Sequence, residues 1–235
     1  MKKLLPICLI LLIAFNSCAK TKNTDFVFKN PVPLGDPFIM YHDGLYYAYG
    51  TKADNGIQVY TSEDLKEWKL EKDLALKSED SYGDRWFWAP EVYYIKEKNK
   101  FFMYYTANEH ICVATANSPF GPFVQDVKEP MLPDEKAIDN SLYIDADGKP
   151  YLYFDRFNDG LNIWVAKLED DLKTIDQASM KPCIHVSQEW ETVWPRVNEG
   201  PFVVKHGELY YMTYSGNSYE SPHYGVGFAT SKSVE

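Results

Sequence analysis

Residues 36–49 read DPFIMYHDGLYYAY: an acid opens a short apolar run, and a turn then leads into a Tyr-rich strand. The same plan returns three more times, as EVYYIKEKNKFFMYY at 91–105, DNSLYIDADGKPYLYF at 139–154 and EGPFVVKHGELYYMTY at 199–214. In every copy the turn falls seven to nine residues after the acid, and successive acids stand 48 to 60 residues apart. Self-similarity at such a spacing predicts a repeat architecture.

Each copy holds more than one hairpin. A third apolar strand is expected at 57–61, 111–116, 161–167 and 224–230, and three of the copies continue into a polar turn and a fourth segment. Four antiparallel strands per repeat predict an all-β fold of the β-propeller type. The last copy ends after its third strand. We therefore expect a propeller of the five-bladed type with four repeats visible in this chain, and a four-bladed ring is the alternative.

The acids that open the repeats are Asp36, Glu91, Asp139 and Glu199. The first strand of each propeller blade lies nearest the axis, so we expect these carboxylates on one level around the mouth of the central channel. Carboxylates that crowd together raise one another's pKa, and a cluster of that cost indicates a function. Carboxylates at chosen separations are the tools of glycoside hydrolysis.

The charge and the aromatic content of the chain limit the classes of molecule that it is expected to bind. The net charge is −10 and the isoelectric point about 5, which argues against nucleic acid because an acidic surface gains nothing from counterion release. Phe, Trp and Tyr make up 16% of the chain. Aromatic side chains suit pleated sheets and also stack on sugar rings, and most of them are expected in the core. No phosphate-binding glycine loop is present in the sequence.

The N-terminus predicts export. A basic pair, Lys2-Lys3, precedes an apolar run over 4–15 that is too short to span a membrane and ends near Cys18. Residues 1–18 resemble a bacterial lipoprotein signal with Cys18 as the lipidated residue, residues 19–25 would be a tether, and 26–235 would be the propeller domain, incomplete at its C-terminus. An ordinary cleaved signal and an uncleaved anchor are the alternatives. The expected location is a bacterial membrane surface, through the lipid anchor, or the periplasm.

Two cysteines remain beyond the signal, Cys112 and Cys183. An exported protein permits a disulfide between them, whereas the apolar context of Cys112 favours a buried thiol. The sequence has no CxxC motif and no His/Cys cluster, so no metal site is expected.

Four local motifs resemble glycoside hydrolase family 43, a family of five-bladed propeller enzymes that cleave arabinose, xylose and related sugars with inversion. The motifs occur in the family's order, at D-P-F-I (36–39), W-A-P-E-V (88–92), I-D-N-S-L (138–142) and E-G-P (199–201). The resemblance implies that Asp36 is the general base, that Glu199 is the general acid, and that Asp139 orients the acid and modulates its pKa. It covers roughly residues 30–235.

Further residues are candidates for sugar contact. Trp86 and Trp88 flank Phe87 just before Glu91. Alternate residues of a strand share a face, so the two Trp side chains could stack on sugar, with Trp88 favoured, while Phe87 packs; packing of the triplet between blades is the alternative. Glu91 is taken as substrate-binding, with a backbone contact or a catalytic role as alternatives. Trp190 and Trp194 precede the proposed acid and could rim the pocket or pack.

The resemblance implies an inverting glycosidase with a carbohydrate substrate and no required cofactor, although it allows a structural calcium ion in the complete family fold. An exo-acting α-L-arabinofuranosidase or β-xylosidase is favoured, and endo-arabinanase is the runner-up. A carbohydrate-binding propeller without turnover and a protein-interaction propeller are the alternatives outside enzymes. The sequence leaves the sugar, the linkage and the oligomeric state open.

Overall fold

The computed structural model describes residues 32–193 and 196–235. The expected signal over 1–18 with Cys18, the tether over 19–25 and Trp194 lie outside these residues, and those expectations stay predictions. Within the described ranges the helices are four short 3-10 turns, at Ser78–Asp80, Lys96–Lys98, Gln177–Ser179 and Glu189–Thr192. None of the described helices has the length and apolar character needed to cross a bilayer.

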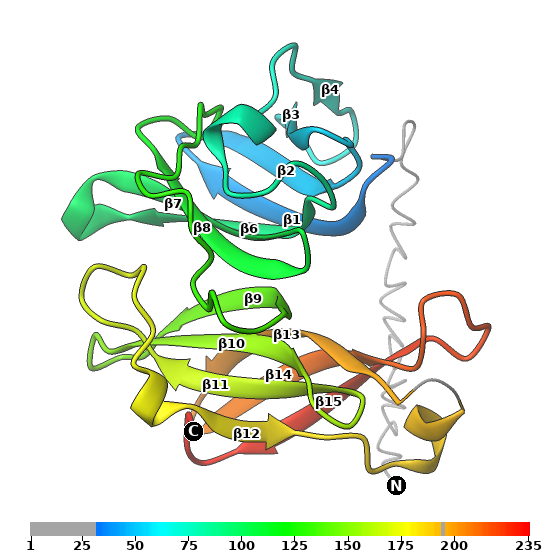
Figure 1. The fold of residues 1–235 in the computed structure, drawn as a ribbon. Coiled ribbons are helices and arrows are strands. Elements are labelled where there is room, and N and C mark those ends of the chain that lie inside the picture. The colour runs from blue at the N-terminus through cyan, green and yellow to red at the C-terminus, as the bar shows by residue number, and fades with distance from the viewer. Residues whose placement is uncertain (1–31, 194–195) are drawn as a thin grey trace, which may run out of the picture.

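Four antiparallel sheets follow one another along the chain and confirm the all-β, propeller-type prediction (Figure 1). Sheet 1 contains β1 (Gly35–His42), β2 (Leu45–Thr51), β3 (Gly56–Ser62), β4 (Lys69–Leu70) and β5 (Leu76–Lys77). Sheet 2 contains β6 (Trp88–Ile95), β7 (Lys100–Ala107) and β8 (His110–Ala116). Sheet 3 contains β9 (Ala137–Ile144), β10 (Pro150–Phe157), β11 (Leu161–Lys167) and β12 (Lys181–Ile184). Sheet 4 contains β13 (Asn198–His206), β14 (Leu209–Gly216) and β15 (Gly225–Ser231).

The first strands of the sheets, β1, β6, β9 and β13, are called the inner strands here. Each inner strand contacts the next one in chain order, so the sheets are arranged around them like blades. The third strands predicted from the sequence coincide with β3, β8, β11 and β15 within one residue. The fourth segment was predicted less well. In the second repeat, where it was expected at 117–123, only Phe123 forms an isolated bridge, to Leu76, and the following Val124 forms another, to Thr115.

Aromatic and aliphatic side chains fill the three junctions between successive sheets. Tyr49, Phe87 and Phe123 belong to the cluster between sheets 1 and 2. The second cluster, with Phe102 and Phe154, joins sheets 2 and 3, and the third joins sheets 3 and 4. Most aromatic residues therefore serve the core, as expected, because large flat side chains match the gap between stacked sheets.

The thiol of Cys112 is buried in the first cluster, which confirms that prediction, while Cys183 is exposed. Both cysteines are free, so the disulfide that the sequence permitted is not formed.

Every inner strand is bulged at its start. The first bulge residue has a positive φ in all four strands, and these residues are Asp36 (44°), Ala89 (40°), Asp139 (55°) and Gly200 (63°). The second bulge residue is Pro37, Pro90, Asn140 or Pro201. Proline is tolerated there because the extra residue of a bulge leaves the hydrogen-bond ladder.

The bulges show that the four acids do not align as the sequence analysis expected. Asp36 and Asp139 occupy the first bulge position, whereas Glu199 precedes it by one residue and Glu91 follows it by two. The four acids therefore do not stand on equivalent sites of the repeat. The prediction failed because it counted residues to the turn, while a bulge adds a residue and changes which face the following side chains use.

Candidate active site

Asp36 is exposed at the start of β1, and its carboxylate has one protein partner among the described residues. The Thr51 hydroxyl donates a hydrogen bond of 2.6 Å to Asp36 Oδ2. Thr51 Oγ1 in turn accepts a hydrogen bond of 3.0 Å from the backbone N–H of Ala89 in the next sheet. The Thr51 hydroxyl thus orients the Asp36 carboxylate and leaves it open to solvent. A group that takes a proton from water must be accessible in this way.

Asp139 lies deeper, at the start of β9. The pKa of Asp139 is raised to about 8. Burial is the main cause, and the negative charges of Glu199, Asp36 and Glu91 contribute as well. A hydrogen bond with Asp155 acts in the opposite direction. Acids from all four sheets are therefore within electrostatic reach of one another, which is the crowding that the propeller prediction required.

Glu199 is partly buried at the start of β13. Its pKa is raised mainly by burial and further by the charge of Asp36. The hydroxyl of Tyr224 donates a hydrogen bond of 2.9 Å to Glu199 Oε1 and lowers the pKa. A carboxyl group whose burial favours the protonated form can serve as a proton donor near neutral pH.

Glu91 is already engaged by the protein. Its carboxylate accepts hydrogen bonds from the Tyr93 hydroxyl (2.5 Å), from the side chain of Ser141 and from the backbone N–H of Leu142. Burial nevertheless raises the Glu91 pKa to about 7. The contacts link β6 to β9, which matches the alternative of a backbone contact; direct sugar binding by Glu91 stays a prediction.

Two polar residues next to the acids were not identified from the sequence, Asp155 and Tyr224. Asp155 is fully buried on β10, and its Oδ2 accepts a hydrogen bond of 3.0 Å from the Gly200 N–H. Tyr224 precedes β15 and reaches back to Glu199. An alignment of the second strands of the sheets could have revealed Asp155. Thr51, Thr106 and Asp155 occupy equivalent positions, because each pairs with the residue that precedes the bulge of its own inner strand.

The two Trp side chains of the triplet separate from Phe87 as expected, but not through strand alternation, because Trp86 and Phe87 precede β6 and Trp86 has a φ of 56°. Phe87 is 1% exposed and belongs to the core. The rings of Trp86 and Trp88 stack with centroids 5.7 Å apart and an interplanar angle of 20°, and Arg85 lies over the Trp86 ring. Trp86 is 42% exposed, so this stacked pair presents an aromatic surface to solvent beside the start of β6. Contact with a sugar stays a prediction for both residues.

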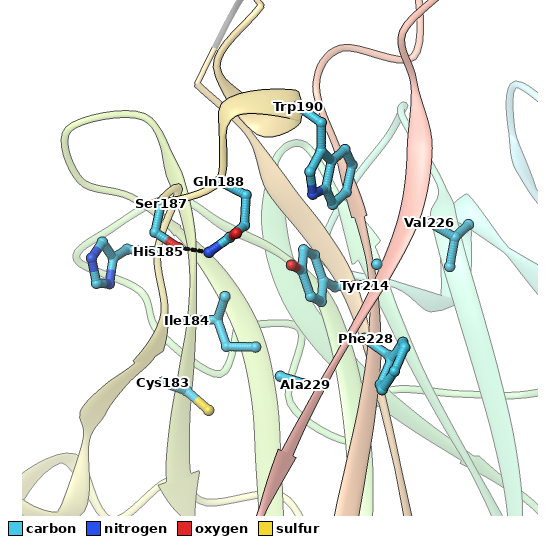
Figure 2. A pocket seen from close by; sticks show the side chains of 11 residues that line it. Cys183, Ile184, His185, Ser187, Gln188, Trp190, Tyr214, Val226, Phe228 and Ala229 are labelled. Carbon is cyan, nitrogen blue, oxygen red and sulfur yellow. Dashed lines mark hydrogen bonds between the residues drawn. The ribbon is translucent and has the colours of Figure 1, made fainter.

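A pocket of about 580 Å³ lies away from the acids, between β12 and the β14–β15 pair (Figure 2). Trp190, Tyr214 and Phe228 are among its lining residues, and no carboxylate lines it. Trp190 stacks on Tyr214 and rests on glycines 216 and 227, where a Cβ would approach within 3 Å of its ring or that of Tyr214. Trp190 therefore packs against sheet 4, and the pocket, although His185 lines it, contains no pair of carboxyl groups such as glycoside hydrolysis uses.

The far end of the inner strands is apolar. A second pocket, of about 560 Å³, is lined there by residues 38–42, 92–95, 142–144 and 202–203. The opposite ends of the same four strands carry the acids. Within the described residues no three His, Cys, Asp or Glu side chains are grouped to hold a metal ion, and the calcium ion that the resemblance allowed stays a prediction.

Comparison with known proteins agrees with the geometry. The family model described as "Glycosyl hydrolases family 43" matches residues 28–235. The crystal structure of an endo-1,4-β-xylanase from Bacteroides thetaiotaomicron superposes with a TM-score of 0.83 at 50% identity, over 86% of this chain and 70% of that one.

Two curated relatives are more distant. The β-D-galactofuranosidase xynD of Aspergillus niger is 26% identical over 87% of this chain and 63% of its own length. The extracellular endo-α-(1→5)-L-arabinanase 1 of Bacillus subtilis is 25% identical over 72% of this chain and 54% of its own. The chain thus spans less than two thirds of the curated relatives that it matches. The match over 28–235 and the xylanase superposition together show that the chain belongs to glycosyl hydrolase family 43.

Proposed function

We propose that the protein hydrolyses O-glycosidic bonds with inversion, using Asp36 as general base and Glu199 as general acid. The observation that carries the proposal is the contrast between these two acids. Asp36 is exposed and held by one hydroxyl, whereas burial raises the pKa of Glu199. Inversion needs such a pair: an ionised carboxylate that deprotonates water, and a protonated carboxyl that assists the leaving group.

Asp139 would modulate and orient the acid. The charge of Glu199 raises the pKa of Asp139, and because this repulsion is mutual, Asp139 would favour the protonated form of Glu199 whenever Asp139 itself is ionised. Trp86 and Trp88 would supply the aromatic surface for a sugar ring, because the exposed Trp86 ring stacks on the half-buried Trp88 ring beside the start of β6.

The substrate would be a glycan that contains xylose or arabinose, cleaved by exo-acting α-L-arabinofuranosidase or β-xylosidase chemistry. An endo mode on a β-1,4-xylan chain is the second candidate, because the relative at 50% identity is named an endo-1,4-β-xylanase. The names of the curated relatives add arabinan and galactofuranosides to the substrates worth testing. The N-terminal segment would export the protein and anchor it through Cys18.

Proton NMR tests the proposal directly. The protein is mixed with arabino- and xylo-oligosaccharides, with their aryl α-L-arabinofuranosides and β-D-xylosides, and with a galactofuranoside. We expect a product whose anomeric signal first appears inverted. Terminal single sugars as first products would support the exo mode, and internal fragments would support the endo mode. Saturable binding without any cleavage would contradict the hydrolase and favour a carbohydrate-binding propeller.

A further inference from the structure

One hydrogen bond recurs at the three junctions between successive sheets. In each junction a side chain of the second strand accepts a bond of 3.0 Å from the backbone N–H of the first bulge residue in the following sheet. The acceptors are Thr51 Oγ1, Thr106 Oγ1 and Asp155 Oδ2, and they are called the junction residues. Their donors are Ala89, Asp139 and Gly200.

The third junction uses a carboxyl group where a hydroxyl group suffices in the other two. Asp155 is fully buried, and burying an ionised carboxylate is costly unless it is paired with a cation or amply hydrogen-bonded. Neither Asp155 nor Asp139 forms an ion pair with a cation anywhere in the described chain. A threonine would hold the Gly200 N–H at lower cost, so the carboxyl group has a second task.

The unused oxygen of Asp155 indicates that task. Asp155 Oδ1 is buried, and no amide, hydroxyl or cationic group of the described residues donates a hydrogen bond to it. The Asp139 carboxyl is its hydrogen-bonding neighbour, and two carboxyl groups bond only when one of them holds a proton. Burial and the charge of Asp139 both raise the pKa of Asp155 well above its usual range, and Glu199 adds to this. The other groups that face Asp139, namely Asp36 and Glu91, are acids as well.

We propose that Asp155 is a positioning residue of the hydrolytic site, which keeps a proton at neutral pH, shares it with Asp139 and holds the Gly200 N–H with its other oxygen. One side chain then fixes β9, which carries Asp139, against β13, which carries Glu199. Once Asp139 ionises, the pair of aspartates bears a single negative charge. The inference rests on the proposed function, because it assigns Asp155 to the same site.

Two substitutions distinguish the two roles of Asp155, the proton shared with Asp139 and the hydrogen bond from the Gly200 N–H. Asp155→Asn keeps both bonds, since the amide oxygen can accept from Gly200 and the amide nitrogen can donate to Asp139. Asp155→Thr copies the other junctions and keeps only the acceptor. We expect Asp155→Asn to retain kcat within about threefold with an unchanged pH profile, and Asp155→Thr to lower kcat about tenfold or more at a KM within about threefold.

The kinetic outcomes decide the role. An Asp155→Thr enzyme with wild-type kcat and pH profile would reduce Asp155 to a structural junction residue and overturn the proposal. Equal losses in both variants would also overturn it, because the amide preserves what the proposal requires. Melting temperatures of both variants verify that each is folded.

A measurement without turnover keeps the inference distinct from the proposed function. NMR titration of protein labelled with ¹³Cγ-aspartate excludes Glu91 and Glu199 from the signals. We expect two aspartate resonances that titrate together near or above neutral pH, that vanish as a coupled pair in Asp155→Asn, and that persist in the control Asp159→Asn. A wild-type protein that cleaves no glycoside yet shows this pair would contradict the function alone. Aspartate resonances that all titrate below pH 5 would contradict the shared proton.

Discussion

The two ends of the four inner strands differ in what they contribute to the protein. At one end Asp36, Asp139 and Glu199 converge, and burial together with like charge raises the pKa of the last two. At the other end the same strands line a pocket with apolar side chains over 38–42, 92–95, 142–144 and 202–203. The acid end brings like charges together for the sake of chemistry, whereas the other end combines buried side chains such as Val92 with exposed ones such as Ile39 and Phe202.

Backbone geometry separates the two ends. The bulges lie only at the acid end, where they place one residue of each strand in the left-handed region and redirect the side chains that follow. Beyond the bulge each strand pairs regularly with its neighbour as far as the turn. Substitutions at the acid end should therefore change activity, and substitutions at the apolar end should change stability.

The largest effect is expected for Asp36→Asn. The amide keeps the size of the side chain but cannot accept a proton from water, so kcat/KM should fall about 10,000-fold while the melting temperature stays the same or rises. Steady-state kinetics on the substrate identified by NMR measure the first quantity, and calorimetry measures the second. Asp43→Asn is the matched control, because Asp43 is exposed in the turn at the other end of β1. Comparable kinetics for Asp36→Asn and wild type would refute its role as base.

Glu199→Gln should show the next largest effect, and its size should depend on the leaving group. Without a proton donor the cleavage of an oligosaccharide is expected to slow about 100- to 1,000-fold, whereas an aryl glycoside with an acidic phenol leaving group should lose much less. Wild-type activity should fall at high pH because Glu199 loses its proton, and this fall should be absent in Glu199→Gln. Glu208→Gln, in the exposed β13–β14 turn, is the control. Equal losses on both substrates would argue against general acid catalysis.

At the apolar end, Val92→Ala should lower the free energy of unfolding by about 2 kcal/mol and leave KM and kcat within twofold. Val92 is 1% exposed and borders both the second pocket and the first core cluster, so its truncation removes burial without touching the acids. Urea denaturation measures the change. Val204→Ala is the control, because Val204 is 47% exposed on β13. A loss of activity larger than the loss of stability would show that the two ends are coupled.

The pH dependence of stability is expected to change at Glu91. Its pKa of about 7 in the folded protein exceeds the ordinary value of 4.5, so the folded state binds the proton more tightly than the unfolded chain. The contribution of Glu91 to stability is therefore complete below about pH 4.5 and is lost as pH rises through 7, on the order of 3 kcal/mol at most.

Glu91→Gln should flatten the fall of the melting temperature between pH 5 and 8, which differential scanning calorimetry measures. Glu97→Gln, exposed in the 3-10 turn after β6, should leave the slope unchanged. An identical slope in wild type and Glu91→Gln would show that the Glu91 carboxylate is not destabilised by burial.

The sequence by itself determined the repeat, the hairpins and the all-β class, because alternation, turn residues and third strands are local properties of the chain. It also identified the D-P, D-N and E-G-P segments that bring Asp36, Asp139 and Glu199 to the starts of the inner strands. The split of Trp86 and Trp88 from Phe87 was expected from strand alternation, but Trp86 and Phe87 precede β6 and Trp86 has a φ of 56°, so the local backbone decides it.

Only the tertiary structure decided how these acids are held. The bulge register, the bonds of Glu91 to Ser141 and Leu142, and the reach of Tyr224 to Glu199 depend on strands that lie far apart in sequence. Asp155 is the clearest example, since YLYFD reads as an ordinary strand end, and its importance comes from its burial between Asp139 and Gly200. Burial and charge coupling are sums over neighbours in space, and a linear sequence does not specify those neighbours.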